Sequence, residues 1–535
     1  MKKTKFVFAL SSIAAIATLS GCFGKKNTDN ERDETKAQLE ISTFDGGVGD
    51  QWLKNAADLF VQQNKDRTDF EDGKLGVQIT ITKETVGGTT ILNSDLNKDM
   101  YFTEEVDYYG VTNKNKMADI TDILTEANPN DGGKKIIDKV DANLKGYLNR
   151  NGKYYAVPFY DCIYGLVYDK DLFNEKSFYM TDSGNFTNNK SQFGTGPNGV
   201  AGDWDDGLPK TYAQFSSLMN RMRTMNVTPF VYADNVEVSR YTARGLMSYW
   251  SDDEGYEDTM LNYSFSGTAN HIVSSISGGT PVLEAPTTIT KENGYLLKKQ
   301  AGVYNALKFA DTVLCSQADN YTGAADNIKA QTAFVNGTDS GKKVAMMFEG
   351  PWWENEATDA FEVAKRMGKT SFNYGLMAIP KSSDAKVGED ATFLNLNSSY
   401  GFINANSKHM KLAKEFFKFL HTDAQLKQFT TTTHMTRGLN YTLSESEISG
   451  LTSFSQDLMK IKQSEHAKLV YPVCGEKFFI DHASDFDAEE WLWGSSNLGR
   501  NPIPKFIGTP SLDAETYFTD HYTVFPKSKW DQIIA

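Results

Sequence analysis

The sequence predicts an α/β protein with two large lobes. The chain has 535 residues, whereas a single hydrophobic core rarely grows beyond about 250 to 300 residues. Its first part alternates between runs with the period of a strand and runs with the period of a helix. Strand, helix and strand in succession indicate a parallel sheet covered by helices. Hydrophobic residues make up 40% of the chain, which is enough apolar material for two cores.

The elements expected in the first lobe follow one another closely along the chain. In order, we expect a strand over 38–44, a helix over 49–66, a strand over 77–84, a helix over 90–100 and a strand over 106–110. Ligands of such sheets bind beyond the carboxyl ends of the strands. The loops over 44–47 and 108–110 are therefore the first candidates for the wall of a binding site.

Two polar segments interrupt the regular elements of the later part. Residues 180–210 and 262–295 are rich in small and polar residues, which is typical of surface loops. Residues 203–207 (DWDDG) suggest calcium, but Gly207 stands where an EF-hand loop needs a carboxylate, so a solvated turn is favoured. Helices are expected over 211–223, 304–313 and 411–420.

The composition excludes nucleic-acid binding and a polytopic membrane protein. Lys and Arg number 55 against 69 Asp and Glu, giving a net charge of −14, and a phosphate backbone requires a basic field. Charged residues at 23% are ordinary for globular proteins. HExxH and GxSxG motifs are absent from the sequence, and the seven His residues do not fall at metal-ligand spacing. We therefore expect no catalytic residues, no cofactor and no metal site.

The amino terminus has the pattern of a lipoprotein signal peptide. Three lysines among the first five residues precede a mostly apolar run over 6–19, too short to cross about 30 Å of hydrocarbon. Residues 19–22 (LSGC) resemble the bacterial lipobox, in which the cysteine receives acyl chains such as palmitate; the alternative is an ordinary signal peptide with a chance cysteine. We expect a signal peptide over 1–21 and a flexible tether over 22–37, with the protein anchored through Cys22 on the extracellular face of the cytoplasmic membrane.

The remaining cysteines are Cys162, Cys315 and Cys474, which lie far apart in the sequence. Their odd number and wide spacing predict neither a zinc site nor a disulfide framework. One disulfide is allowed, and none is favoured.

Several segments in the middle of the chain resemble bacterial extracellular solute-binding proteins of the maltose-binding type. Residues 152–173 (GKYYAVPFYDCIYGLVYDKDLF) are similar to the first crossing between the two lobes of that family, and 208–212 (LPKTY) to the start of a helix, with Tyr212 in place of the usual Trp. Residues 341–352 (GKKVAMMFEGPW) are similar to the strand and turn that present a sugar-stacking tryptophan. Residues 374–380 and 400–404, followed by the helix around 411–420, resemble the second crossing and the return to the first lobe, and the similarity covers most of 38–440.

The resemblance implies a two-lobed periplasmic-binding-protein-like fold of type II. The ligand cleft would lie between lobes joined by crossing hinge segments, and the lobes would close on the ligand. Lobe 1 is expected over 38–160 and 400–440, and lobe 2 over 165–396 and 441–535. Residues 441–535 match no pattern of the family and are expected to cap the cleft or to brace lobe 2.

The candidate ligand-binding residues follow from the chemistry of sugars, which offer a C–H face to aromatic rings and hydroxyl groups to polar side chains. Trp352 is the main candidate because a Gly-Pro-Trp turn holds it at a strand end; the alternative is a core tryptophan. Trp353 shares the site or points elsewhere, and Asp161 and Tyr160 bind hydroxyl groups or belong to the hinge. The other candidates, for which ordinary packing or solvation is the alternative, are Glu349, Trp250, Tyr232, Asp234, Phe44, Asp45, Tyr400 and Arg437.

These features predict a lipid-anchored, monomeric substrate-binding component of an ABC importer that delivers an oligosaccharide to the permease subunits. Two other classes stay open. A surface glycoside hydrolase or lyase would need two carboxylates about 5 to 10 Å apart across the cleft. The adjacent residues Glu489 and Glu490 are one pair of acidic residues that could serve as acid and nucleophile. A structural or adhesive lipoprotein would bind no small molecule.

Overall fold

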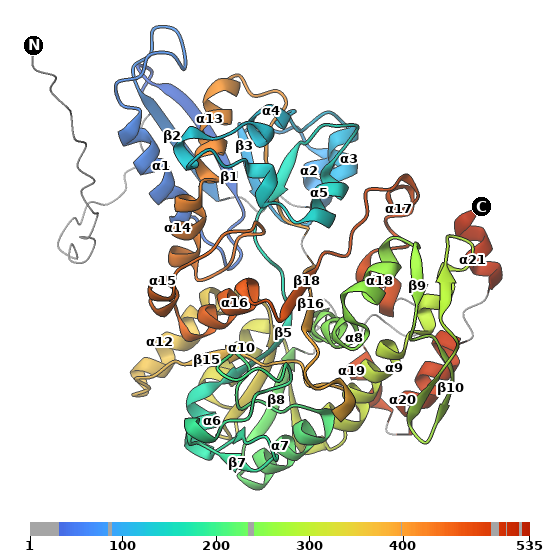
Figure 1. The fold of residues 1–535 in the computed structure, drawn as a ribbon. Helices are drawn as coiled ribbons and strands as arrows, with labels where there is room; N and C mark the ends of the chain where they lie inside the picture. The colour runs from blue at the N-terminus through green and yellow to red at the C-terminus, as the bar shows by residue number, and fades with distance from the viewer. Residues whose placement is uncertain are drawn as a thin grey trace, which may run out of the picture.

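The computed structural model describes residues 32–83, 88–233, 240–396, 398–493, 502–509, 511–523 and 527–535. Cys22, the expected signal peptide and Asp234 lie outside these ranges. Two five-stranded sheets form the centres of two lobes, and a smaller unit lies beside the second lobe (Figure 1). Among the described helices, none combines the length and the apolar character needed to cross a membrane.

The sheet of lobe 1 has the strand order β2-β1-β3-β17-β4. The central strand β1 (Ala37–Thr43) runs parallel to β2 (Val77–Lys83) and to β3 (Met100–Thr103). Strand β17 (Tyr400–Ile403) returns from far along the chain and is antiparallel to both β3 and β4 (Ala156–Pro158). The helices of this lobe are α1 (Gln51–Gln63), α2 (Gly88–Asn93), α3 (Tyr108–Asn113), α4 (Thr121–Thr125), α5 (Ala142–Leu148), α13 (Met410–Leu420) and α14 (Asp423–Thr433). The parallel arrangement of the strands expected over 38–44 and 77–84 is confirmed.

The strand expected over 106–110 is wrong, because this segment is the start of helix α3. The Asp107 side chain accepts a hydrogen bond from the Gly110 amide at 2.8 Å, a helix cap that prevails over the strand preference of the two tyrosines. The third strand is instead β3, whose four residues are all buried. The helix expected over 90–100 is correspondingly shorter. The loop beyond the carboxyl end of this strand therefore begins at Glu104 rather than Tyr108.

The sheet of lobe 2 repeats the pattern of lobe 1, with the order β13-β8-β14-β5-β15. Strands β13 (Tyr321–Ala324), β8 (Thr228–Ala233) and β14 (Val344–Glu349) are parallel. Strand β5 (Gly165–Asp169) is antiparallel to β14 and to β15 (Tyr374–Leu376). The other elements of this lobe are α6 (Lys170–Lys176), β6 (Tyr179–Met180), β7 (Phe186–Thr187), α7 (Tyr212–Thr224), α8 (Arg240–Met260), α9 (Ala301–Lys308), α10 (Asn327–Asn336), α11 (Trp353–Glu356) and α12 (Thr358–Arg366). Helices α7, α9 and α13 confirm the three helices expected late in the chain.

The turn expected over 203–207 is confirmed, but its exposure to solvent is wrong. Trp204 packs against Phe393, and Asp205 is completely buried. The Asn198 amide donates to Asp205 Oδ2 at 3.0 Å, while burial raises the pKa of Asp205 to about 7. This segment therefore contributes to the packing of lobe 2.

The lobes are joined by more than the two expected crossings. The first runs from β4 to β5 and the second from β16 (Ala391–Leu394) to β17. Beyond residue 440, α15 (Glu445–Ser449) leads to α16 (Ser453–Gln463) and to β18 (Ala467–Val470), which pairs with β16. Ile448 and Leu451 pack into the lobe 1 core, whereas Phe454 and Leu458 pack into the lobe 2 core. Residues 441–463 thus form a third connection and do not belong to lobe 2 alone.

The smaller unit combines the segment 262–295 with the end of the chain. The segment expected to be a loop carries one hairpin, β10 (Val273–Ser277) with β11 (Thr280–Leu283), and around it the antiparallel pair of β9 (Gly267–Ala269) with β12 (Thr287–Ile289). A separate apolar cluster joins Phe265 and Ile272 to Phe486, Trp491 and Trp530. The helices of the chain end are α17 (Lys477–Asp481), α18 (Ala488–Trp493), α19 (Pro502–Gly508), α20 (Ala514–Phe518) and α21 (Lys527–Ile534).

The folded part of the chain begins earlier than expected. The Asp33 amide donates to Gln78 Oε1 at 2.7 Å, and the Leu75 amide donates to the Thr35 carbonyl at 2.9 Å. These bonds attach residues 33–37, assigned to the tether, to strand β2 and the turn before it. Cys162, Cys315 and Cys474 are all free thiols.

Candidate ligand-binding cleft

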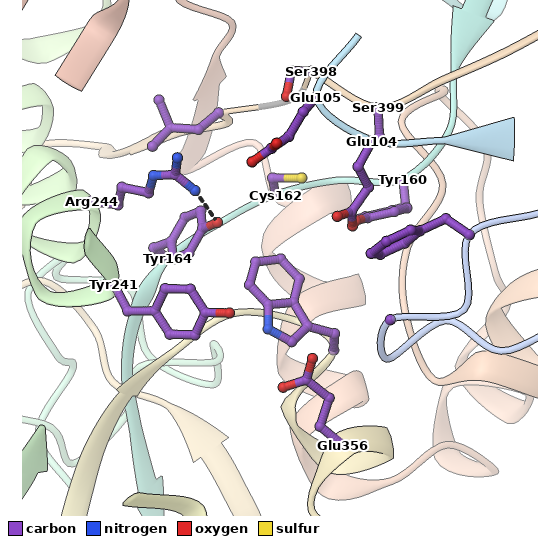
Figure 2. A pocket seen from close by; sticks show the side chains of 14 residues that line it. Glu104, Glu105, Tyr160, Cys162, Tyr164, Tyr241, Arg244, Glu356, Ser398 and Ser399 are labelled. Carbon is purple, nitrogen blue, oxygen red and sulfur yellow. Dashed lines mark hydrogen bonds between the residues drawn. The ribbon is translucent and has the colours of Figure 1, made fainter. Parts of the chain in front are cut away.

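A pocket of about 300 Å³ lies between the two lobes, beside the crossing segments (Figure 2). Lobe 1 contributes the loops beyond the carboxyl ends of β1 and β3, and lobe 2 contributes the start of α8 and the turn after β14. The lining residues are Phe44, Gly46, Glu104, Glu105, Tyr160, Cys162, Tyr164, Tyr241, Arg244, Trp352, Glu356, Leu396, Ser398 and Ser399. The pocket thus occupies the position at which α/β sheets bind ligands.

Aromatic side chains form one wall of this pocket, with Trp352 at its centre. The Trp352 ring makes edge contacts with Tyr164, Tyr241 and Tyr160, at centroid distances of 5.1, 5.9 and 6.5 Å. The turn after β14 holds the ring close to its own backbone, since a Cβ at Gly350 would lie 2.4 Å from Trp352 Cη2. Three tyrosines, which come from both lobes, therefore hold the Trp352 ring in place at the border of the pocket.

Carboxyl groups approach the pocket from both lobes. Those of Glu104 and Glu105 point into it from lobe 1, and that of Glu356 points toward it from lobe 2 (Figure 2). Burial, together with the charges of Glu105 and Glu356, raises the pKa of Glu104 to about 8. Glu105 has a φ of 51°, an uncommon backbone conformation for a residue other than glycine. At neutral pH the Glu104 carboxyl is therefore mainly protonated, so it can donate as well as accept a hydrogen bond.

A second layer of polar groups orients Glu356. Gln331 Nε2 donates to Glu356 Oε2 at 3.0 Å and to Glu349 Oε1 at 2.9 Å. Burial raises the pKa of both carboxyl groups, and the charge of Glu356 raises that of Glu349 further. A shared amide donor therefore holds the carboxyl group of Glu356, which lines the pocket, and that of Glu349, which lies behind it.

Arg244 is the one basic side chain among the described residues that line the pocket. Its Nη1 donates to the Tyr164 hydroxyl at 2.7 Å, and its Nε donates to Glu489 Oε2 at 3.1 Å. The guanidinium is thus already paired with the first crossing and with α18. Three glutamates against one paired arginine leave the pocket acidic.

The cleft continues into an adjoining hollow of about 240 Å³. Arg244, Leu396 and Ser398 line both spaces. The far side of the hollow is formed by Tyr109 and Tyr147 of lobe 1 and by the C-terminal residues Phe479, Phe486, Asp487 and Glu489. Residues beyond 441 therefore border the cleft as well as packing on the second lobe.

The two lobes touch at the rim of the pocket. Asn355 Nδ2, from lobe 2, donates to the carbonyl oxygens of Gly47 at 2.6 Å and Thr433 at 2.8 Å, both in lobe 1. Gly47 has a φ of 68°, and a Cβ at this position would lie 2.3 Å from Trp352 Cβ. The close approach of the lobes requires glycine at position 47.

Of the candidates from the sequence, the structure brings Trp352, Tyr160 and Phe44 into the pocket lining. Glu349 lies behind the wall as described above. Asp161 is completely buried in the hinge, where Oδ1 accepts from Asn395 and Oδ2 from Thr436.

The other candidates lie away from the pocket. Trp353 is fully buried in lobe 2 against Phe334, Tyr374 and other rings. Asp45 is exposed and pairs with Lys83 at 3.0 Å. The remaining described candidates are buried in the cores: Trp250 bonded to Gln300, Tyr232 against Tyr321, Tyr400 against Tyr108, and Arg437 against Trp52 and bonded to His421.

Sequence reasoning missed Glu104, Glu105, Tyr241, Arg244 and Glu356. The two lobe 1 glutamates follow β3 directly, so a correct position for that strand would have identified them. Tyr241 and Arg244 lie at the start of α8, and no sequence signal distinguished that helix from others.

Comparison with known proteins identifies the family. The model of the bacterial extracellular solute-binding protein family matches residues 54–427. The chain belongs to this family. Similar solved structures include RafE from Streptococcus pneumoniae, at 13% identity over 94% of this chain and 100% of that chain, with a TM-score of 0.54. RafE has also been solved in complex with raffinose, with a TM-score of 0.53.

Two further structures share the fold of this solute-binding protein. The Thermus thermophilus maltotriose binding protein, bound with maltotriose, has 14% identity over 93% of this chain and 100% of that chain, with a TM-score of 0.50. The GacH receptor of Streptomyces glaucescens has 13% identity over 93% and 98%, with a TM-score of 0.52. A search of curated proteins finds no match. The family and the two-lobed α/β fold expected from the sequence are thus confirmed.

Proposed function

We propose that this solute-binding protein binds a neutral oligosaccharide in the cleft and delivers it to the permease of an ABC importer. The observation that carries the proposal is the position of Trp352, which lines the pocket together with Glu104, Glu105 and Glu356. An aromatic ring suits the C–H face of a pyranose, and carboxyl groups suit its hydroxyl groups. Micromolar binding needs about 8 kcal/mol, so several such groups must act together.

The charge of the pocket supports a neutral ligand. Arg244 is already bonded to Tyr164 and Glu489, whereas three glutamates border the pocket. A uronate or sugar phosphate would bring a negative charge into a partly desolvated space where the one basic side chain among the described lining residues is already paired, which costs free energy. The adjoining hollow supports a ligand of more than one sugar unit, since the two spaces share one wall. Raffinose and maltotriose in the related structures are ligands of the same kind.

Calorimetric titration with matched sugars tests the proposal. We expect neutral oligosaccharides to bind more tightly than their monosaccharide units and than oligosaccharides of equal length that contain uronic acid. Tighter binding of the uronic-acid series would contradict the neutral pocket. No heat and no thermal shift with any sugar would favour an adhesive lipoprotein instead.

The proposal includes the absence of catalysis and a monomeric protein on the outer face of the membrane, held by lipid at Cys22. The alternative of a glycoside hydrolase or lyase is favoured by one observation, that carboxyl groups from both lobes reach the pocket. Chromatography of oligosaccharides after incubation with the protein separates the two. Products that accumulate with time would overturn the transport function.

A further inference from the structure

A second group of ligand-type side chains lies on α8 and on the segment between the smaller unit's first two strands. His271 Nδ1 is 3.2 Å from Glu254 Oε2 and 3.1 Å from Asp258 Oδ2. One ligand atom from each of the three side chains lies within 4.8 Å of the others. None of the three is among the described residues that line the cleft. The cluster is therefore separate from the sugar site.

The acidic side chains in and around this cluster do not all have a cation of their own. The neighbouring acids have cations of their own, since Asp252 pairs with Lys381 at 3.0 Å and Asp253 with Lys386 at 3.2 Å. Glu254 and Asp258, with side chains 0% and 4% exposed, share one imidazole. An imidazole carries at most one positive charge, and Lys386, whose charge also acts on Glu254 and His271, is already paired with Asp253, so two ionised carboxylates here would keep a net negative charge. Such a charge is costly in a low-dielectric interior.

The positions of the ligand atoms fit a metal ion. A tetrahedral zinc with ligands at about 2.0 to 2.1 Å places those ligands about 3.3 to 3.4 Å apart. The two distances from His271 Nδ1, 3.2 and 3.1 Å, are close to this value. A nitrogen ligand disfavours calcium and magnesium, which prefer oxygen, and favours a transition metal. The His271 side chain is 34% exposed, which leaves a path for the ion and space for a water ligand.

Surrounding groups orient the carboxylates. The Gly302 amide donates to Glu254 Oε1, and the Asn270 amide donates to Asp258 Oδ2 at 3.3 Å. The helix is interrupted between the two acids at Gly255, with φ 76° and ψ 171°. Bonds of this kind to metal-binding carboxylates fix the direction of their oxygen atoms.

We propose that Glu254, Asp258 and His271 bind one divalent transition-metal cation, with zinc the best match to the ligand spacing. The ion joins α8 to the segment before β10 and so fastens the smaller unit to lobe 2. Metal binding requires an Nδ1 atom of His271 that carries no proton, so the metal affinity should fall at low pH.

Calorimetry on protein treated with a chelator and then freed of it tests the site. We expect one zinc ion to bind per chain, measured by the stoichiometry of the titration. His271→Gln should lower the zinc affinity at least tenfold. The matched control is His466→Gln, because His466 Nδ1 lies 3.2 Å from Asp390 at a site where both side chains are more than two-fifths exposed. The control should bind zinc as the unchanged protein does.

Crystals soaked in zinc give a measurement that needs no variant and so holds even if His271→Gln fails to fold. An anomalous difference peak within bonding distance of His271 Nδ1 supports the proposal. It is overturned if the peak lies elsewhere, if neither zinc nor manganese saturates the protein, if calcium alone binds, or if folded His271→Gln binds zinc unchanged.

Discussion

Lys462 Nζ lies 2.8 Å from Asp161 Oδ2, and both side chains are buried, at 5% and 1% exposure. Asp161 stands on the first crossing and Lys462 on α16, the third connection between the lobes. The same carboxylate accepts hydrogen bonds from Asn395 beside the second crossing, at 2.8 Å, and from Thr436 of lobe 1, at 2.7 Å. The Asp161 carboxylate, on the first crossing, is thus bonded to the second crossing and to the third connection as well.

Lys462→Met should destabilise the protein strongly, because it leaves the Asp161 charge buried without its cation. Removal of one partner from a buried pair typically costs about 3 to 5 kcal/mol. The matched control is Lys468→Met, whose Nζ lies 3.9 Å from Asp390 with both side chains largely exposed. That change should cost no more than about 1 kcal/mol. Urea unfolding of both variants measures the difference, and equal losses would show that Lys462 has no special place in the hinge.

Ligand should close the lobes, and Gly47→Ala should oppose closure. An alanine Cβ at position 47 would collide with Trp352, so the rim contact seen here could not form. Gly49→Ala is the control, because Gly49 has nearly the same φ, 67° against 68°, but no atom within 4 Å of an added Cβ. We expect both variants to lose similar stability and only Gly47→Ala to lose affinity.

Small-angle scattering checks the closure itself. The radius of gyration of the unchanged protein should decrease with saturating sugar, and that of Gly47→Ala should decrease less. An unchanged profile despite proven binding would count against a hinge.

The arrangement of the fold could largely be predicted from the sequence, because a mostly apolar run identifies β1, alternation of apolar and polar residues identifies β2, and a single apolar face identifies α1. The error at residues 106–110 arose where a local cap competes with strand preference. Capping by Asp107 depends on the side chain's direction, which composition does not reveal. The third connection through α16 was missed because its two faces pack on different lobes.

The candidate site was harder to predict from the sequence than the fold, because a cleft between lobes is made by residues that are distant in the sequence. Trp352 and Trp353 are adjacent, chemically identical and both buried, at 6% and 0% exposure, yet only Trp352 borders the pocket. The turn after β14 decides which ring faces which way, and the sequence indicated only that a turn exists. Asp161 and Arg437 are of residue types that often bind ligands, but both are already bonded inside the protein, Asp161 to Lys462 and Arg437 to His421.

The stability of the ligand-free protein should fall as pH rises from about 5 to 8. Glu104 has a folded pKa of about 8, above the ordinary value near 4.3 of an unfolded chain. The folded state therefore binds more protons than the unfolded state in this window, so raising the pH favours unfolding. Glu104→Gln should lessen the fall of melting temperature, while other buried acids such as Glu349 maintain part of it.

The control for this effect is Glu362→Gln on α12, an exposed residue whose pKa is lowered by Lys365. Glu362→Gln should leave the fall of melting temperature with rising pH unchanged or slightly larger. Thermal melts in a series of buffers at constant ionic strength provide the comparison. A flat profile in the unchanged protein would contradict the protonated Glu104.

Cys22→Ala should release the protein from the membrane or leave an uncleaved precursor. The motif LSGC behind an apolar run motivates this expectation, since acylation of the cysteine gives an anchor of more than one chain. Fractionation of cells and mass spectrometry of the mature amino terminus provide the measurement. A variant that is processed and still carries lipid would refute the lipobox.

Trp352→Ala should weaken sugar binding much more than it weakens folding. The ring borders the pocket, so its removal takes away a stacking surface, and we expect a loss of tenfold or more, or about 1.4 kcal/mol and above. The neighbouring Trp353→Ala is the matched control, since this ring is fully buried among Phe334, Phe361, Tyr374 and Phe454. Truncation there should cost about 3 to 5 kcal/mol of stability.

The two variants must be compared without sugar, because a bound ligand raises apparent stability by itself. Urea unfolding gives the stability of each ligand-free variant, and calorimetry on the folded fraction gives its affinity. Trp352 contacts three tyrosines, so some loss of stability is expected, but it should be smaller than that of Trp353→Ala. If Trp352→Ala unfolds as early as Trp353→Ala while its folded fraction binds sugar normally, Trp352 braces the lobes and does not contact the ligand.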